Sequence, residues 1–136
     1  AMLAAMALGA EGIQAGTLFA LTEESSASKE FKKRCTELAE GDTMLCLKKI
    51  APTRLIKNAL YTKLAEAEDK GATADELREI LGRAASKRGI FEGDMESGEL
   101  EIGQIASAIK TIKPVSEVMK ELISGFEKAK ERVAFL

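Results

Sequence analysis

The residues in this sequence best suited to chemistry are a glycine and a threonine, Gly16 and Thr17, which could together hold an anion. A short apolar run, 11–15, precedes them, and a segment rich in acids and hydroxyls, 22–28, follows. Glycine lets a ligand approach the backbone closely, and the neighbouring N–H groups and the hydroxyl are hydrogen-bond donors. A strand that ends in this pair offers a phosphate site. The same pair also occurs as an ordinary turn glycine beside a surface hydroxyl.

The remaining polar residues indicate no catalytic group. The chain of 136 residues contains no histidine, which removes the commonest general base, the commonest metal ligand and every nucleophile that histidine activates. Cys35 and Cys46 have no further cysteine or histidine to join them, so two free thiols are expected rather than a disulfide framework or a zinc site. Chemistry by this chain alone would need carboxylates, lysines, its one tyrosine or a cofactor, and we expect no catalytic residue and no metal site.

Composition and charge describe one globular domain. Apolar residues make up 46% and charged residues 31%, with a net charge of -2, which predicts no nucleic-acid partner and no membrane surface. Residues 1–21 are apolar, but Glu11, Gln14 and three glycines interrupt them and no basic segment precedes them. This pattern argues against a spanning helix and a signal peptide, so a cytoplasmic protein is expected.

The elements that would position Gly16 and Thr17 are mostly helical, with one or two short strands. Residues 2–8 are strong helix formers that stop at Gly9, and 11–15 has room for a short strand. Ser28 is placed to cap a helix over 29–40, in which three apolar residues fall on one face: Phe31, Cys35 and Leu38.

After Gly41 the pattern predicts an extended segment over 43–50, followed by helices. Pro52 suits the first turn of a helix, and Thr73 with Glu76 forms a capping-box signature. The expected helices cover 53–70, 74–87, 104–112 and 114–136, with a loop over 88–103.

Several ordered motifs carry a resemblance to a known family. They are LAAMALGAEGIQAGTLFALTEES, GDTMLCLKK, PTRLIKN and FEGDMESGELEIGQIASAIKTIKPVSEV. Over about residues 2–125 the sequence resembles the C-terminal part of the nitronate monooxygenases, formerly called 2-nitropropane dioxygenases. It is also similar to their close relative, the flavin-dependent type II enoyl-acyl-carrier-protein reductase.

The resemblance implies the C-terminal fragment of an FMN-binding (β/α)8 TIM barrel. Residues 1–28 would be the last barrel helix, strand and phosphate-side loop, and residues 29–136 a helical C-terminal region. The positions that hold the flavin phosphate would be Gln14, Ala15, Gly16 and Thr17. The resemblance also places Gln104 where it could approach the flavin or substrate, although it could simply cap its own helix.

The sequence departs from the family pattern in several places. Leu18 stands where the family usually has arginine, and Ser28 where many relatives have histidine. A TIM barrel needs eight strands and about 250 residues, and the glycine-rich flavin loops and the catalytic histidine of many members are absent. We therefore expect this chain alone to be inactive and to bind FMN weakly or not at all.

Three functions are possible. In the first two, the whole protein is an enzyme that acts on a small-molecule substrate. We favour nitronate monooxygenase, with flavin-dependent enoyl-acyl-carrier-protein reductase as the alternative. A third possibility, from another class, is a self-standing helical interaction module over 52–136. Without the earlier strands, the helix over 2–8 and the strand over 11–15 would be uncovered, so we expect a homo-oligomer through residues 1–20.

Overall fold

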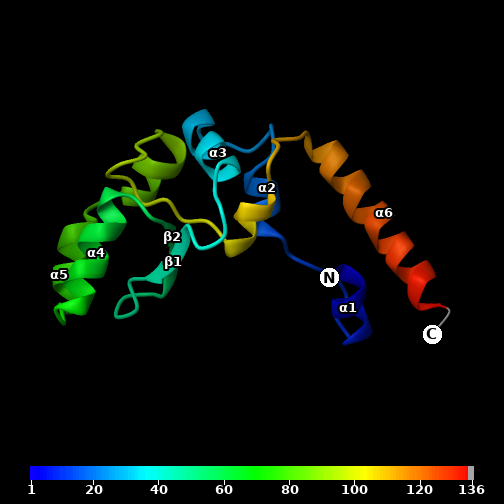
Figure 1. The fold of residues 1–136 in the computed structure, drawn as a ribbon, viewed down its shortest axis with the longest axis horizontal. Helices are drawn as coiled ribbons and strands as arrows, with labels where there is room; N and C mark the ends of the chain where they lie inside the picture. The colour runs from blue at the N-terminus through cyan, green and yellow to red at the C-terminus, as the bar shows by residue number, and fades with distance from the viewer. Residues whose placement is uncertain (135–136) are drawn as a thin grey trace.

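The computed structural model describes residues 1–134, which are mostly helical with one two-stranded sheet. Figure 1 shows α2 and α3 near the middle, the hairpin beside α4 and α5 on one side, and α6 with α1 on the other. The elements are α1 (Met2–Ala7), α2 (Gly16–Ala20), α3 (Lys29–Thr36), β1 (Thr43–Cys46), β2 (Thr53–Ile56), α4 (Ala59–Asp69), α5 (Ala74–Leu81), the π-helical turn η1 (Lys87–Phe91), the 3-10 turn η2 (Gln104–Ala108) and α6 (Val115–Val133).

The sheet is an antiparallel hairpin with a third segment beside it. Thr43 lies opposite Ile56, so β1 and β2 pair along their full length. On the other side of β2, the Ile56 N–H donates to the Leu100 carbonyl (2.9 Å), and the Ile102 N–H donates to the Arg54 carbonyl (3.2 Å). Segment 100–102 is therefore fixed to the hairpin by backbone hydrogen bonds. The extended segment expected over 43–50 is confirmed for 43–46 only, because residues 48–50 form a turn.

Two hydrophobic cores lie on the two faces of the hairpin. Successive side chains of a strand point to opposite faces, and Leu55 and Ile56 accordingly belong to different cores. The first core contains Leu21, Ala27, Phe31, Cys35, Leu38, Ile56, Leu100, Ile102 and Ala106. The second contains Cys46, Leu47, Leu55, Leu60, Leu64, Leu77 and Ala85. The predicted apolar face of the helix after Ser28 is confirmed as part of the first core.

The helix predicted from 53 onward is wrong at its start. Residues 53–56 form β2, and α4 begins at Ala59. The reason is twofold, because β2 has partners on both sides and Asn58 provides a helix cap. The Asn58 side-chain oxygen accepts a hydrogen bond from the Tyr61 N–H (2.9 Å), and its Nδ2 donates to the carbonyls of Met95 (3.0 Å) and Gly98 (2.9 Å).

The strand predicted over 11–15 is also wrong. A strand needs a neighbour that pairs with its backbone, and no segment of residues 1–134 pairs with 11–15. The loop expected from Gly16 onward instead begins with the short helix α2. Within residues 29–134, the helices are interrupted by both strands of the sheet.

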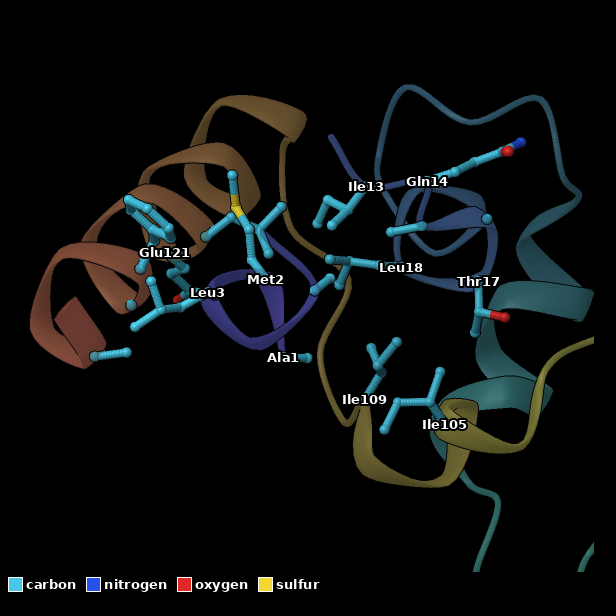
Figure 2. A pocket seen from close by; sticks show the side chains of 17 residues that line it. Ala1, Met2, Leu3, Ile13, Gln14, Thr17, Leu18, Ile105, Ile109 and Glu121 are labelled. Atoms are coloured by element: carbon cyan, nitrogen blue, oxygen red, sulfur yellow. The ribbon is translucent and has the colours of Figure 1, made fainter. Parts of the chain in front are cut away.

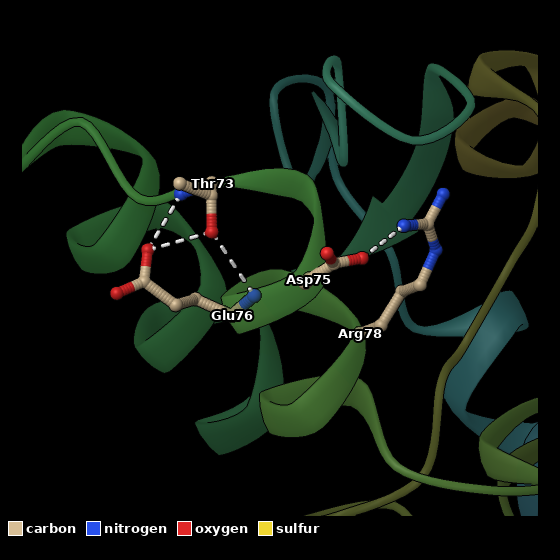
Figure 3. Close-up of polar contacts among 4 residues, drawn as sticks. All are labelled: Thr73, Asp75, Glu76 and Arg78. Atoms are coloured by element: carbon tan, nitrogen blue, oxygen red, sulfur yellow. Dashed lines mark hydrogen bonds and ion pairs between the residues drawn. The ribbon is translucent and has the colours of Figure 1, made fainter.

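The capping box at the start of α5 is confirmed (Figure 3). The Glu76 carboxylate accepts hydrogen bonds from the Thr73 N–H (2.7 Å) and hydroxyl (2.9 Å), while the Glu76 N–H donates to the Thr73 hydroxyl (3.3 Å). These bonds hold the pKa of Glu76 below its ordinary value. The helix ends at Leu81, before the predicted 87, because Gly82 adopts a φ of 70° that leaves the helical region. The loop predicted over 88–103 contains most of η1.

We predict that Asn58→Ala lowers the free energy of unfolding by about 2–4 kcal/mol. It removes a helix cap, worth about 1 kcal/mol, and it deprives two carbonyls of their donor, at about 1–3 kcal/mol. Urea unfolding followed by circular dichroism measures the change. Asn58→Asp is the matched control, because it keeps the cap acceptor but faces both carbonyls with an oxygen. An aspartate variant as stable as the unchanged chain would show that the bonds to Met95 and Gly98 contribute nothing.

We also predict that the fold weakens in alkali because of its buried thiols. Burial raises the pKa of Cys35 to about 12, and burial with a hydrogen bond to Glu68 raises that of Cys46 to about 11. Above about pH 9 the unfolded thiols ionise while the folded ones keep their protons. Their contribution is therefore complete below pH 9 and is lost as the pH rises through the folded values.

Urea unfolding at pH 7, 9 and 10.5 tests this expectation. Cys35→Ala should be less stable at pH 7, because it leaves a cavity. Its stability should nevertheless fall less steeply above pH 9, by up to about 1.4 kcal/mol per pH unit. Equal slopes in the two proteins would contradict the assignment.

Candidate functional site

Gly16 and Thr17 form the first turn of α2 and lie against the start of η2. The Gly103 N–H donates to the Thr17 hydroxyl oxygen at 3.0 Å, across 86 residues of sequence. The structure thus brings together two motifs that are distant in the sequence, Gly16-Thr17 and Gly103-Gln104. No sequence signal paired them.

The backbone at Gly16 is open to a ligand. Gly16 is exposed, and a Cβ added there would have no neighbour within 4 Å. The residue before the helix, Ala15, provides no side-chain cap. Because the first N–H groups of a helix have no partner inside it, these amides are positioned for an acceptor from outside. A helix of five residues has a small dipole, so the amides alone make a weak anion site.

The other predicted site residues are placed as follows. Ala15 and Thr17 are half-buried, and Gln14 and Gln104 are exposed. Figure 2 shows the polar ends of Gln14 and Thr17 directed away from the apolar side chains of the neighbouring cavity. Gln104 is the first residue of η2, whose N-cap residue is Gly103, and both expectations for its side chain stay predictions. It lies next to Gly103 and hence near Thr17.

An apolar cavity of about 710 Å³, which we call the α1–α6 groove, adjoins Gly16 (Figure 2). It lies between α1, the segment 13–18, η2 and α6. Its lining includes Met2, Leu3, Ile13, Leu18, Ile105, Ile109, Leu122 and Phe126, with polar side chains from Gln14, Thr17 and Glu121. Leu18, at the family's arginine position, is one of its apolar walls. Among the described residues the lining holds no lysine or arginine, so a phosphate here would rely on amides and a hydroxyl.

The segment after α2 is fastened to the start of α6. Both carboxylate oxygens of Glu24 accept from the Val115 N–H, at 3.1 and 2.9 Å, and so cap a helix whose own N-cap residue, Pro114, has no acceptor side chain. Thr22 and Lys113 form a parallel bridge beside this cap. Because Pro114 cannot cap α6 with its own side chain, a side-chain cap has to come from another residue. No local pattern identifies Glu24 as its source.

Metal-binding clusters and membrane-spanning helices are two further features to consider within residues 1–134. No group of three or more His, Cys, Asp or Glu residues in 1–134 could hold a metal ion. Over the same residues, no helix is both long and apolar enough to cross a membrane. Both cysteines are free and buried.

Comparison with known proteins identifies the family to which this chain belongs. The family model described as nitronate monooxygenase matches residues 1–125, and the chain belongs to this family. A curated relative, a probable nitronate monooxygenase of Staphylococcus saprophyticus, is 33% identical over 92 residues, which cover 65% of this chain and 26% of the relative. The family membership predicted from the ordered motifs is thereby confirmed.

Solved structures show the same arrangement of elements. FabK from Thermotoga maritima matches with a TM-score of 0.86 and 30% identity, covering 97% of this chain and 42% of that one. A point mutant of the same FabK matches with a TM-score of 0.77 and 28% identity, covering 98% and 40%. The chain therefore spans about a quarter of its curated relative and about two fifths of FabK.

Proposed function

We propose that this chain is the C-terminal part of an FMN-dependent (β/α)8-barrel oxidoreductase and supplies one corner of its flavin phosphate site. The observation that carries the proposal is the open, uncapped start of α2 at Gly16 and Thr17, in a chain of the nitronate monooxygenase family. Gln14 and Ala15 would complete the corner before the helix, and Gln104 would approach the flavin or substrate. When bound, FMN would supply the electron transfer.

The residues present include hydrogen-bond donors of the kind that bind a phosphate, but these donors are few. The amides of Gly16 and Thr17 and the Thr17 hydroxyl are donors, but no cation lines the groove beside them. A millimolar dissociation constant corresponds to only about 4 kcal/mol. We therefore propose that the isolated chain binds FMN no more tightly than this, and that the rest of the cradle comes from the remainder of the barrel.

The isolated chain is proposed to be inactive. It has no histidine, and the one acidic side chain that lines the groove, Glu121, is paired with Lys113. This contact and the one with Glu117 (3.1 Å) raise the pKa of Lys113 above its ordinary value. Lys113 is therefore protonated at neutral pH and cannot act as a general base.

For the whole protein we favour nitronate oxidation, because the family model and the curated relative both carry that name. Reduction of an enoyl thioester is the alternative, since the related reductase shares the same motifs. A self-standing module over 52–136 is less well supported. Ile56 and Leu100 share one core with Phe31 and Leu38, so residues 52–136 would lose part of their core if separated from α3.

We predict that FMN at millimolar concentration shifts the amide resonances of Gly16 and Thr17 in 15N-edited NMR spectra of this chain. The phosphate would accept from these N–H groups, while the amide of Gly71, which lies between α4 and α5, should stay unchanged. Riboflavin, which lacks the phosphate, is the matched control and should leave all three unchanged. Equal shifts with riboflavin, or none with FMN, would contradict the phosphate corner.

We further propose that two copies of the chain associate through residues 1–20, with α6 extending the contact. The 19-residue α6 is about 28 Å long, whereas the six residues of α1 cover only about 9 Å of it. Leu8, which follows α1, and Ile13, which lines the groove, are exposed (90% and 43%), as is Ile123 on α6 (55%). Large exposed apolar surfaces favour association.

Charge along α6 suits an antiparallel pair. Its first half carries two acids and one lysine, a net charge of -1: Glu117, Lys120 and Glu121. Its second half carries three basic residues and two acids, a net charge of +1: Glu127, Lys128, Lys130, Glu131 and Arg132. Two copies related by a two-fold axis would therefore place opposite net charges side by side.

We predict a dimer at tens of micromolar by light scattering or sedimentation. Ile13→Glu should weaken it by about tenfold or more, because it places a charge in an apolar interface. Met44→Glu is the control, since Met44 is equally exposed (43%) but lies on the hairpin. A monomer for the unchanged chain at these concentrations would overturn the proposal.

A further inference from the structure

The Thr17 hydroxyl has one partner within residues 1–134, the N–H of Gly103 at 3.0 Å. A hydroxyl has one proton to donate and two lone pairs that accept. In this contact the hydroxyl accepts, so its proton stays free for another acceptor. The contact therefore sets both the position of the oxygen and the direction in which it can donate.

Space, and not backbone conformation, requires a glycine at 103. Its φ of -70° and ψ of 154° are values that any residue adopts. A Cβ added there would lie 2.4 Å from the Thr17 hydroxyl oxygen, although 3.6 Å from the Thr17 Cβ. An alanine would thus collide with the hydroxyl alone and leave the rest of Thr17 in ordinary contact.

Gly103 is itself held from both sides. The preceding residue, Ile102, donates its N–H to Arg54 of β2, and Ala106 of η2 is fully buried in the first core. These contacts fix Gly103 relative to the hairpin, and Gly103 in turn fixes the orientation of the Thr17 hydroxyl. The five-residue helix that carries Thr17 would define it much less firmly.

We propose that Gly103 is a positioning residue, which orients the Thr17 hydroxyl to donate its proton to an oxygen of the flavin phosphate. The proposal rests on the flavin site proposed above. It assigns to Gly103 a role in ligand binding through Thr17, without contact between Gly103 and the ligand.

A double-mutant cycle tests the contact itself. Gly103→Ala should lower the urea midpoint when Thr17 is present, because the hydroxyl must move. In a Thr17→Ala background the same change should have little effect, since the colliding atom is gone. Gly12→Ala is the matched control: Gly12 has no neighbour within 4 Å and no positive φ, so this variant should unfold as the unchanged chain does.

FMN titration of the same variants, followed by the Gly16 amide resonance, tests the positioning role. Thr17→Ser should retain the affinity, whereas Gly103→Ala and Thr17→Ala should each weaken it by about tenfold, the loss expected for one hydrogen bond to a charged group. The double variant should bind no more weakly than Thr17→Ala alone.

The outcomes separate the two proposals. If the unchanged chain responds to FMN but Gly103→Ala binds it equally well, the contact is merely structural and the positioning role is overturned. A cycle without coupling overturns it too, while leaving the phosphate corner intact. If no FMN response is seen in the unchanged chain, the flavin site itself is wrong and the positioning role falls with it.

Discussion

The backbone pairing of segment 100–102 with β2 is the constraint on which the rest of the structure depends. Two hydrogen bonds, from Ile56 to Leu100 and from Ile102 to Arg54, join segments that are more than forty residues apart. Because Leu55 and Ile56 point to opposite faces, this pairing also divides the apolar residues into two cores. The first core takes Leu100 and Ile102 from this segment, so it could not close around a hairpin that remained open on this side.

The candidate site is a consequence of the same pairing. The chain leaves the sheet at Ile102 and reaches Thr17 one residue later, at Gly103. A few residues after α2, the Glu24 carboxylate caps α6 and so joins this segment to the start of that helix. The start of α2 is thus held between two parts of the second half of the chain, and its amides remain exposed on one side. The groove beside them is left uncovered because α1 is much shorter than α6.

Local sequence patterns predicted structure that depends on nearby residues, but they failed where contacts with distant segments determine the secondary structure. Thr73 and Glu76 lie three residues apart, so the capping box was readable from the sequence and is present. Residues 53–56 are compatible with a helix or a strand, and only pairing with β1 and 100–102 makes them β2. Segment 11–15 was misassigned for the opposite reason, since no partner for it lies within residues 1–134. The phosphate motif could be located from its residue types, but the role of Gly103 could not, because no signal links it to Thr17.

The composition of the first core has a consequence for synthesis on the ribosome. Leu21, Phe31 and Leu38 share their core with Leu100 and Ala106, so this core is complete only after the last third of residues 1–134 has been made. Translation is slow compared with the collapse of a small chain. The early apolar segments would therefore remain accessible to chaperones for seconds before native burial is possible.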